Sequence, residues 1–146
     1  MYESEIIHES FRLGAAYKRQ RHLEAEEKYR DAKEQPPHGH GRILKNLVLH
    51  GPMTQSELAE VLQIRPQSLT VAMQKLEEQG YVLRERDPKN RRKILVSVTE
   101  EGKKHSGQLD TERESTAKKL LKALSEEEKK QMYELLKKVN KEERDA

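Results

Sequence analysis

Residues 54–79 read TQSELAEVLQIRPQSLTVAMQKLEEQ, and this stretch decides the fold because it predicts two helices joined by a very short turn. Thr54 and Glu57 have the spacing of a capping box, in which two side chains bind the first unpaired amides of a helix. The first helix ends at a tight turn, residues 63–65. Pro66 suits the first position of the second helix, which continues to the end of the stretch.

Apolar residues in and before this stretch recur at helical spacing. In the second helix, the residues expected to face inward are Leu69, Ala72, Met73 and Leu76. A preceding helix has on one face Ile43, Leu44, Leu47 and Val48. That helix closes at Gly51, which can adopt a positive φ, and at Pro52, which cannot continue a helix. These apolar faces are the expected core.

Beyond Gly80, the expected C-cap, the apolar period changes from that of a helix to that of a strand. Residues 81–86 and 93–98 alternate in polarity and predict two strands. The six residues between them, DPKNRR, favour a turn and are basic. Thr99 opens a further helix with acidic first residues, which suit the positive end of a helix dipole.

The resulting order is helix, short helix, turn, helix and β-hairpin, which is the order of a winged helix-turn-helix. The predicted fold class is therefore mainly α with a small β-hairpin. The second helix of such a motif fits the major groove of double-stranded DNA, where each base pair presents a distinct set of donors and acceptors. The hairpin can bring basic side chains to the neighbouring minor groove.

The outer parts of the chain predict long helices. Residues 1–35 contain an apolar stripe formed by Ile6, Ser10, Leu13 and Tyr17. The last helix begins with a second capping box, residues 125–128, and its stripe is Met132, Leu135, Leu136 and Val139. Charged residues make up 38% of the 146 residues and hydrophobic ones 33%, a low apolar share for a lone globule. We therefore expect solvated helices, apolar faces completed by a second copy of the chain, or both.

Positive charge is concentrated in the predicted hairpin. The net charge is only +3, but residues 84–93 hold six basic and two acidic side chains, so an anionic partner would bind there. The chain has no cysteine, which excludes disulfides and thiolate metal sites. It also lacks a signal-peptide pattern and an apolar segment of membrane-spanning length. A soluble cytoplasmic protein without membrane contact is expected.

Residues 41–102 resemble the winged-helix core of the MarR family of bacterial transcription regulators. The resemblance rests on LAEVL at 58–62 followed by Ile64 and Pro66, on LEEQGYV at 76–82, on DPKNRR at 87–92 and on VSVTEEG at 96–102. The resembling region covers nearly half of the chain, and its motifs follow one another in the order expected for the family.

The resemblance implies a homodimer whose N- and C-terminal helices interlace beneath two DNA-binding regions. It divides the chain into an N-terminal dimerisation helix at 1–37, a winged helix-turn-helix region at 38–102 and C-terminal dimerisation helices at 103–146. Such a dimer is expected to bind a pseudo-palindromic operator, with its two recognition helices in major grooves about 34–36 Å apart. The implied function is sequence-specific transcription regulation, with a repressor favoured.

The candidate DNA contacts lie on two elements. One is the second helix of the motif, which begins at Pro66 and is called the recognition helix, and the other is the predicted hairpin, which is called the wing. Base-edge or phosphate contacts are expected from the first turns of the helix, at Gln67, Ser68, Thr70 and Val71. Arg65 stands where the family usually has a small capping residue and could reach a phosphate or a guanine, and Lys75 is expected to contact the DNA backbone.

In the wing, Arg92 corresponds to the minor-groove arginine of the family, and a guanidinium suits a narrow, strongly negative groove. Asn90, also a candidate DNA contact, stands where the family commonly has an aspartate, so its amide can accept a hydrogen bond but cannot form the charged brace of that arginine. Lys89 and Arg91 are expected to attract phosphates, and Asp87 to cap the turn.

The resemblance also implies a small-molecule effector pocket where the DNA-binding region joins the dimerisation helices. Its candidate residues are Phe11, Tyr17, His38, His40 and Leu44. No metal site is expected, because the chain lacks cysteine, a His-x-x-x-His pair and a compact His/carboxylate cluster. No cofactor and no catalytic residue is expected either, since there is no phosphate loop or nucleophile motif. The alternative to DNA binding is a winged-helix protein-interaction module, against which the basic hairpin argues.

Overall fold

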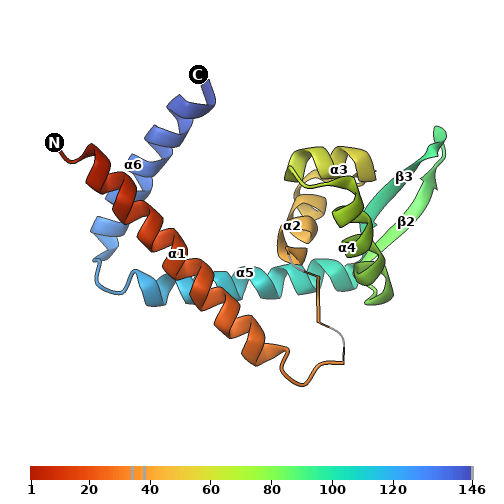
Figure 1. Ribbon diagram of the computed structural model, residues 1–146, viewed down its shortest axis with the longest axis horizontal. Coiled ribbons are helices and arrows are strands. Elements are labelled where there is room, and N and C mark those ends of the chain that lie inside the picture. The colour runs from red at the N-terminus through yellow and green to blue at the C-terminus, as the bar shows by residue number, and fades with distance from the viewer. Residues whose placement is uncertain (34, 38, 146) are drawn as a thin grey trace. The chain divides into compact units, whose positions relative to one another are not determined.

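The computed structural model describes residues 1–33, 35–37 and 39–145 and forms two compact units (Figure 1). The central unit is Tyr29–Glu112. The outer unit combines Met1–Lys28 with Arg113–Ala146. The long helix α5, Glu100–Leu120, contributes residues to both units.

The central unit is a small helical bundle with a three-stranded antiparallel sheet. Its elements in chain order are α2 (His40–His50), β1 (Met53–Thr54), α3 (Gln55–Leu62), α4 (Pro66–Glu78), β2 (Val82–Asp87), β3 (Asn90–Val98) and the first part of α5. The strand order is β1-β3-β2. Figure 1 shows that the β2–β3 hairpin extends away from α2, α3 and α4.

Local sequence signals set the ends of α3 and α4 as predicted. The capping box of α3 is present, because the amide of Glu57 donates to the Thr54 hydroxyl at 3.1 Å and the amide of Thr54 donates to the Glu57 carboxylate at 3.2 Å. Gln63 ends α3 in the left-handed region with φ 55°. This residue was not singled out in advance, since its side chain gives no signal for that conformation. The three-residue turn and Pro66 at the start of α4 are confirmed.

The core of the central unit is apolar and fully enclosed. Its members are Ile43, Leu44, Leu47, Leu58, Ala59, Leu62, Leu69, Ala72, Met73, Leu76, Val82 and Val96. The inward face predicted for α4 is therefore confirmed, but Val48 of α2 is 41% exposed. Its assignment to the apolar face was wrong, because the buried residues of α2 form a narrower stripe centred on Leu44 and Leu47.

The hairpin is longer and its turn tighter than expected. The sequence predicted a turn over residues 87–92, but the strands continue to Asp87 and restart at Asn90, so only Pro88 and Lys89 connect them. Asp87 pairs with Asn90, and an irregularity between Arg86 and Asp87 shifts the register. The short strand β1 was not predicted, because two residues are too few to show a period.

The outer unit contains α1 (Glu3–Lys28), the end of α5 and α6 (Glu126–Asp145). Helix α1 ends well before Gln35, the expected end, and residues 29–31 form a turn. The second capping box is confirmed, with the amide of Ser125 donating to Glu128 at 2.8 Å and the amide of Glu128 to the Ser125 hydroxyl at 3.2 Å. A largely apolar cavity of about 330 Å³ is lined by Ser10, Leu13, Gly14, Tyr17, Ala117, Leu120, Leu121, Met132 and Leu136.

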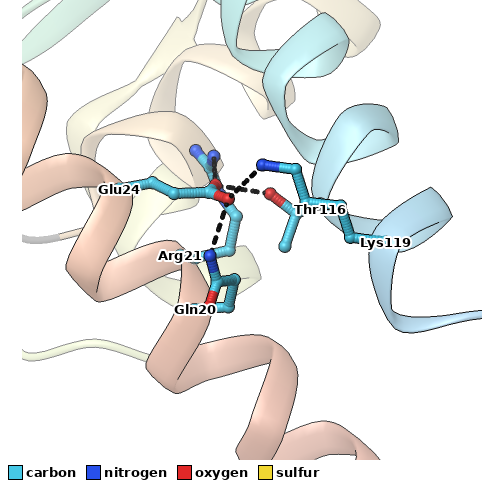
Figure 2. A network of polar contacts seen from close by, with 5 residues as sticks. All are labelled: Gln20, Arg21, Glu24, Thr116 and Lys119. Atoms are coloured by element: carbon cyan, nitrogen blue, oxygen red, sulfur yellow. Dashed lines mark hydrogen bonds and ion pairs between the residues drawn. The ribbon is translucent and has the colours of Figure 1, made fainter.

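Glu24 links α1 to α5 inside the outer unit (Figure 2). Its carboxylate accepts a hydrogen bond of 2.6 Å from the buried hydroxyl of Thr116 and one of 3.1 Å from Gln20. The Nζ atom of Lys119 lies 3.3 Å from one oxygen of this carboxylate, and the Nη1 atom of Arg21 lies 3.2 Å from the other. The hydrogen bond from Thr116, followed by that from Gln20, stabilises the charged form and lowers the pKa of Glu24 from 4.5 to about 2.

We expect Glu24→Gln to lower the free energy of unfolding near neutral pH, and we expect most of this loss to disappear as the pH falls to about 2. A carboxyl whose pKa is depressed by folding contributes stability above its unfolded pKa, and this contribution is lost as the pH falls through the folded value. Urea unfolding of the wild type and the variant between about pH 2 and pH 6 measures the difference. Glu9→Gln, an exposed change on the same helix, is the matched control. A Glu24→Gln difference that stays constant over this range would contradict the assignment.

Candidate nucleic-acid interface

Helix α4 has one buried face and one free face. The core takes up Leu69, Ala72, Met73 and Leu76, so the opposite side of the helix is left to solvent. All five predicted contact residues of this helix are exposed, namely Gln67, Ser68, Thr70, Val71 and Lys75. The helix therefore presents a polar surface with one apolar side chain, which is what readout of base edges and thymine methyl groups requires.

The first turn of α4 carries no side-chain cap. Arg65 is the N-cap residue, with extended backbone angles of φ −66° and ψ 137°, and its exposed side chain makes no capping hydrogen bond. A small cap such as serine would occupy the first amides of the helix. Arg65 instead leaves these amides uncovered and adds a positive charge beside them, an arrangement that favours an anion such as phosphate.

Thr70 braces α4 against α3. Its hydroxyl donates to the carbonyl of Pro66 at 3.0 Å and accepts a hydrogen bond of 2.8 Å from the Gln55 side chain. The proton of this hydroxyl is therefore engaged within the protein. The methyl group of Thr70 and the remaining lone pair of its hydroxyl oxygen stay available for contacts with a ligand. Sequence reasoning missed Gln55, because a capping-box neighbour gives no signal that it contacts a residue fifteen positions away.

Two side chains shape the tip of the wing. The carboxylate of Asp87 accepts the amide of Lys89 at 2.9 Å, which confirms its predicted role as a turn cap. The side-chain oxygen of Asn90 accepts the amide of Arg92 at 3.2 Å. Asn90 thus holds the backbone of Arg92, whereas its guanidinium extends from an exposed residue.

The basic residues of the hairpin divide into two groups. Arg84 forms an ion pair with Glu77, and Arg86 donates to the carbonyl of Arg91 at 3.3 Å. The residues at and beyond the turn, Lys89, Arg91, Arg92 and Lys93, are all exposed. Within the described part of the chain, no acidic side chain pairs with any of these four. The tip therefore carries a cluster of cations without internal neutralisation.

The candidate effector residues are spread over both units. Phe11 is 75% exposed and Tyr17 lines the cavity of the outer unit. In the central unit, Leu44 is fully buried, and the Nε2 atom of His40 lies 3.2 Å from that of His105. His38 lies outside the described residues. The effector pocket stays a prediction.

His105 also stacks on the ring of Tyr81, with ring centroids 4.4 Å apart. Among the described residues, no three His, Asp or Glu side chains are grouped so that they could hold a metal ion. None of the described helices combines the length and the apolar character needed to cross a membrane.

The central unit is a winged helix-turn-helix domain, in which α3 and α4 form the helix-turn-helix and β2 and β3 the wing. This fold, with an exposed recognition helix and a cationic wing, defines a class of DNA-binding proteins.

Comparison with known proteins narrows the class. A family model described as the MarR family matches residues 37–94. The HTH-type transcriptional repressor MdtR of Bacillus subtilis is 31% identical over 86 residues, which cover 59% of this chain and 56% of the repressor. The chain thus spans a little over half the length of that relative.

Solved structures share the fold. A MarR transcriptional regulator from Methanosarcina mazei Go1 has a TM-score of 0.74 at 23% identity, over 94% of this chain and 96% of that chain. The S. aureus MepR–DNA complex has a TM-score of 0.62 at 23% identity, and the match covers 86% of this chain and 91% of that chain. Residues 37–94 are therefore a MarR-family domain, and the proteins of this family are transcription regulators rather than enzymes.

Proposed function

We propose that this regulator binds a specific DNA duplex through α4 and the wing. The supporting observation is that the four cations at the wing tip are exposed and have no acidic partner in the described residues, beside a recognition helix with a free polar face. Phosphate contacts would supply most of the affinity and the α4 side chains most of the sequence preference. A protein with this role is expected in the cytoplasm, where the bacterial chromosome lies.

We further propose that the chain acts as a homodimer. The outer unit exposes large apolar side chains, including Ile6, Ile7, Phe11, Leu135 and Val139. Its largely apolar cavity, lined by residues of α1, of the end of α5 and of α6, is open to solvent. A second copy of the same helices would cover such surfaces, which monomeric proteins rarely leave open. A two-fold dimer would then bind two inverted half-sites.

Repression is the favoured mode of regulation, because the relative MdtR is described as a repressor. A repressor of this type occupies an operator until it is released, and release by a small molecule is part of the proposal. Such an effector would lower operator affinity when it is added to the purified protein.

Selection of bound fragments from random or genomic DNA tests the proposal. We expect enrichment of a motif with two inverted half-sites whose centres are about one helical turn, 34–36 Å, apart. Sedimentation of the free protein should give twice the mass of one chain. A monomer, or binding without preference among duplexes at modest salt, would contradict the proposed function and favour a protein-interaction module.

Gln67 is expected to read a base. Replacing it by alanine should change the preference at one position of each half-site by about 1–3 kcal/mol, because a bidentate amide–base contact discriminates by that amount. Binding to a set of operators with single substitutions measures this effect. If the variant binds all of these operators more weakly by the same factor, Gln67 contacts the backbone instead.

A further inference from the structure

A charged contact joins the wing to the recognition helix. Glu77 lies on the last turn of α4 and Arg84 on β2. The guanidinium approaches the carboxylate with two nitrogen atoms, Nε at 3.5 Å from one oxygen and Nη2 at 3.2 Å from the other. This two-pronged geometry fixes direction as well as distance, because both groups are planar.

The contact lies where the hairpin leaves the core. Arg84 is paired across the sheet with Val96, which is fully buried. The next cross-strand pair on the same face is Arg86 with Ile94, which is only half-buried, and residues 88–93 beyond it are exposed. From Arg84 to Lys89 the hairpin extends about 16 Å, at roughly 3.3 Å per residue. A small tilt at Arg84 therefore moves the tip cations by several ångströms.

The surface is hollowed beside this contact. An open cavity of about 300 Å³ is lined by Glu77, Arg84, Glu85, Arg86 and Ile94. The side chain of Arg84 is only 20% exposed in spite of this cavity. The hydrogen bond from Arg84 also lowers the pKa of Glu77, so the pair stays charged at neutral pH.

From this geometry we propose that Glu77 and Arg84 are positioning residues that set the direction of the wing relative to the recognition helix. Neither residue needs to touch DNA for this role. The pair allows Arg92 to reach its groove while α4 lies in the neighbouring one. The proposal rests on the proposed DNA-binding function, but the direction of the wing can be measured without DNA.

The first experiment measures that direction in the free protein. The chain has no cysteine, so Gln74→Cys on α4 and Lys89→Cys at the tip would carry the only spin labels. Labelled chain is mixed with an excess of unlabelled chain, and the label-to-label distance is measured by pulsed electron paramagnetic resonance. We expect a narrow distribution with the pair intact, and a broader or shifted one in Glu77→Gln and in Arg84→Lys. Arg84→Lys keeps the charge but loses the planar fork. An unchanged distribution in both variants would overturn the proposal whether or not the protein binds DNA.

The second experiment measures the consequence for binding. With the pair intact, Arg92→Ala is expected to weaken operator binding by about a hundredfold for a dimer. In a Glu77→Gln or Arg84→Lys background this factor should fall to about tenfold or less, because a misdirected wing already lacks part of the contact. Glu78→Gln is the matched control, since it removes the same charge from the neighbouring, exposed position. It should leave the full effect of Arg92→Ala in place.

The outcomes separate the two claims. If the wild type binds its operator and Arg92→Ala costs the same in all backgrounds, the positioning role is wrong and the proposed function stands. If the wild type shows no preference among duplexes, the proposed function fails, and the distance measurement still decides whether the pair directs the wing. Thermal unfolding of each variant confirms that the central unit remains folded.

Discussion

Gly102→Ala is expected to destabilise the protein by about 3 kcal/mol or more and to lower its unfolding midpoint by about 10 °C. A Cβ atom at this position would lie 2.1 Å from the carbonyl oxygen of Tyr81 and 2.6 Å from a methyl group of Val98. The carbonyl cannot easily move away, because it accepts the amide of Thr99 at 3.0 Å. The Thr99 hydroxyl in turn donates to the carbonyl of Gly80. The first turn of α5 therefore packs against backbone, and no side-chain rotation relieves the clash.

Gly107→Ala is the matched control for this change. Gly107 lies on the same helix, and a Cβ atom there would meet nothing within 4 Å. Since alanine favours a helix over glycine, this variant should be slightly more stable, by about 0.5–1 kcal/mol. Thermal or urea unfolding of the two variants beside the wild type provides the comparison. Equal stability of Gly102→Ala and the wild type would show that the start of α5 is not held against the turn after α4.

Arg92→Ala is expected to reduce operator affinity by about tenfold for each wing, and so by about a hundredfold for a dimer. The guanidinium is exposed at the wing, with its backbone held by Asn90 and no carboxylate partner in the described residues. It therefore loses little by leaving the protein surface and gains contacts in a narrow groove of strongly negative potential. Fewer counterions are released when it is absent. The slope of log affinity against log salt should consequently become shallower by about one for each wing.

Fluorescence anisotropy with a labelled operator, repeated at several salt concentrations, measures both quantities. Lys138→Ala in α6 removes an equal charge from an exposed position of the outer unit and serves as the control. If Arg92→Ala and Lys138→Ala reduce affinity and slope to the same small extent, net charge rather than the wing accounts for the effect. Unchanged affinity and slope in Arg92→Ala would remove the wing from the proposed interface.

Much of the central unit could be predicted, because its signals are local. The capping box at Thr54, the turn before Pro66 and the positive φ of Gly51 and Gly80 depend on residues a few positions apart. The inward face of α4 follows from helical periodicity in the same way. The exposed residues predicted to contact DNA are simply the complement of that face, which is why all of them are found at the surface.

Features that depend on packing could not be predicted. The Val48 side chain of α2 was expected inside and lies outside, since periodicity does not tell how wide a buried stripe will be. The hairpin turn was placed over six residues because Pro, Lys and Asn all favour turns, whereas pairing with the partner strand extends both strands into that stretch.

The sequence by itself determined where the helices of the central unit begin and end, which side chains form its core and where its positive charge is concentrated. These properties depend on backbone preferences and on the apolar period, both of which act over one or two turns of chain. Only the tertiary structure decided which of the basic side chains are neutralised, because Glu77 meets Arg84 across a turn and Glu24 meets Lys119 across 95 residues. Such partners are chosen by the way whole elements pack, and that choice leaves the cations at the tip of the wing exposed and without an acidic partner among the described residues.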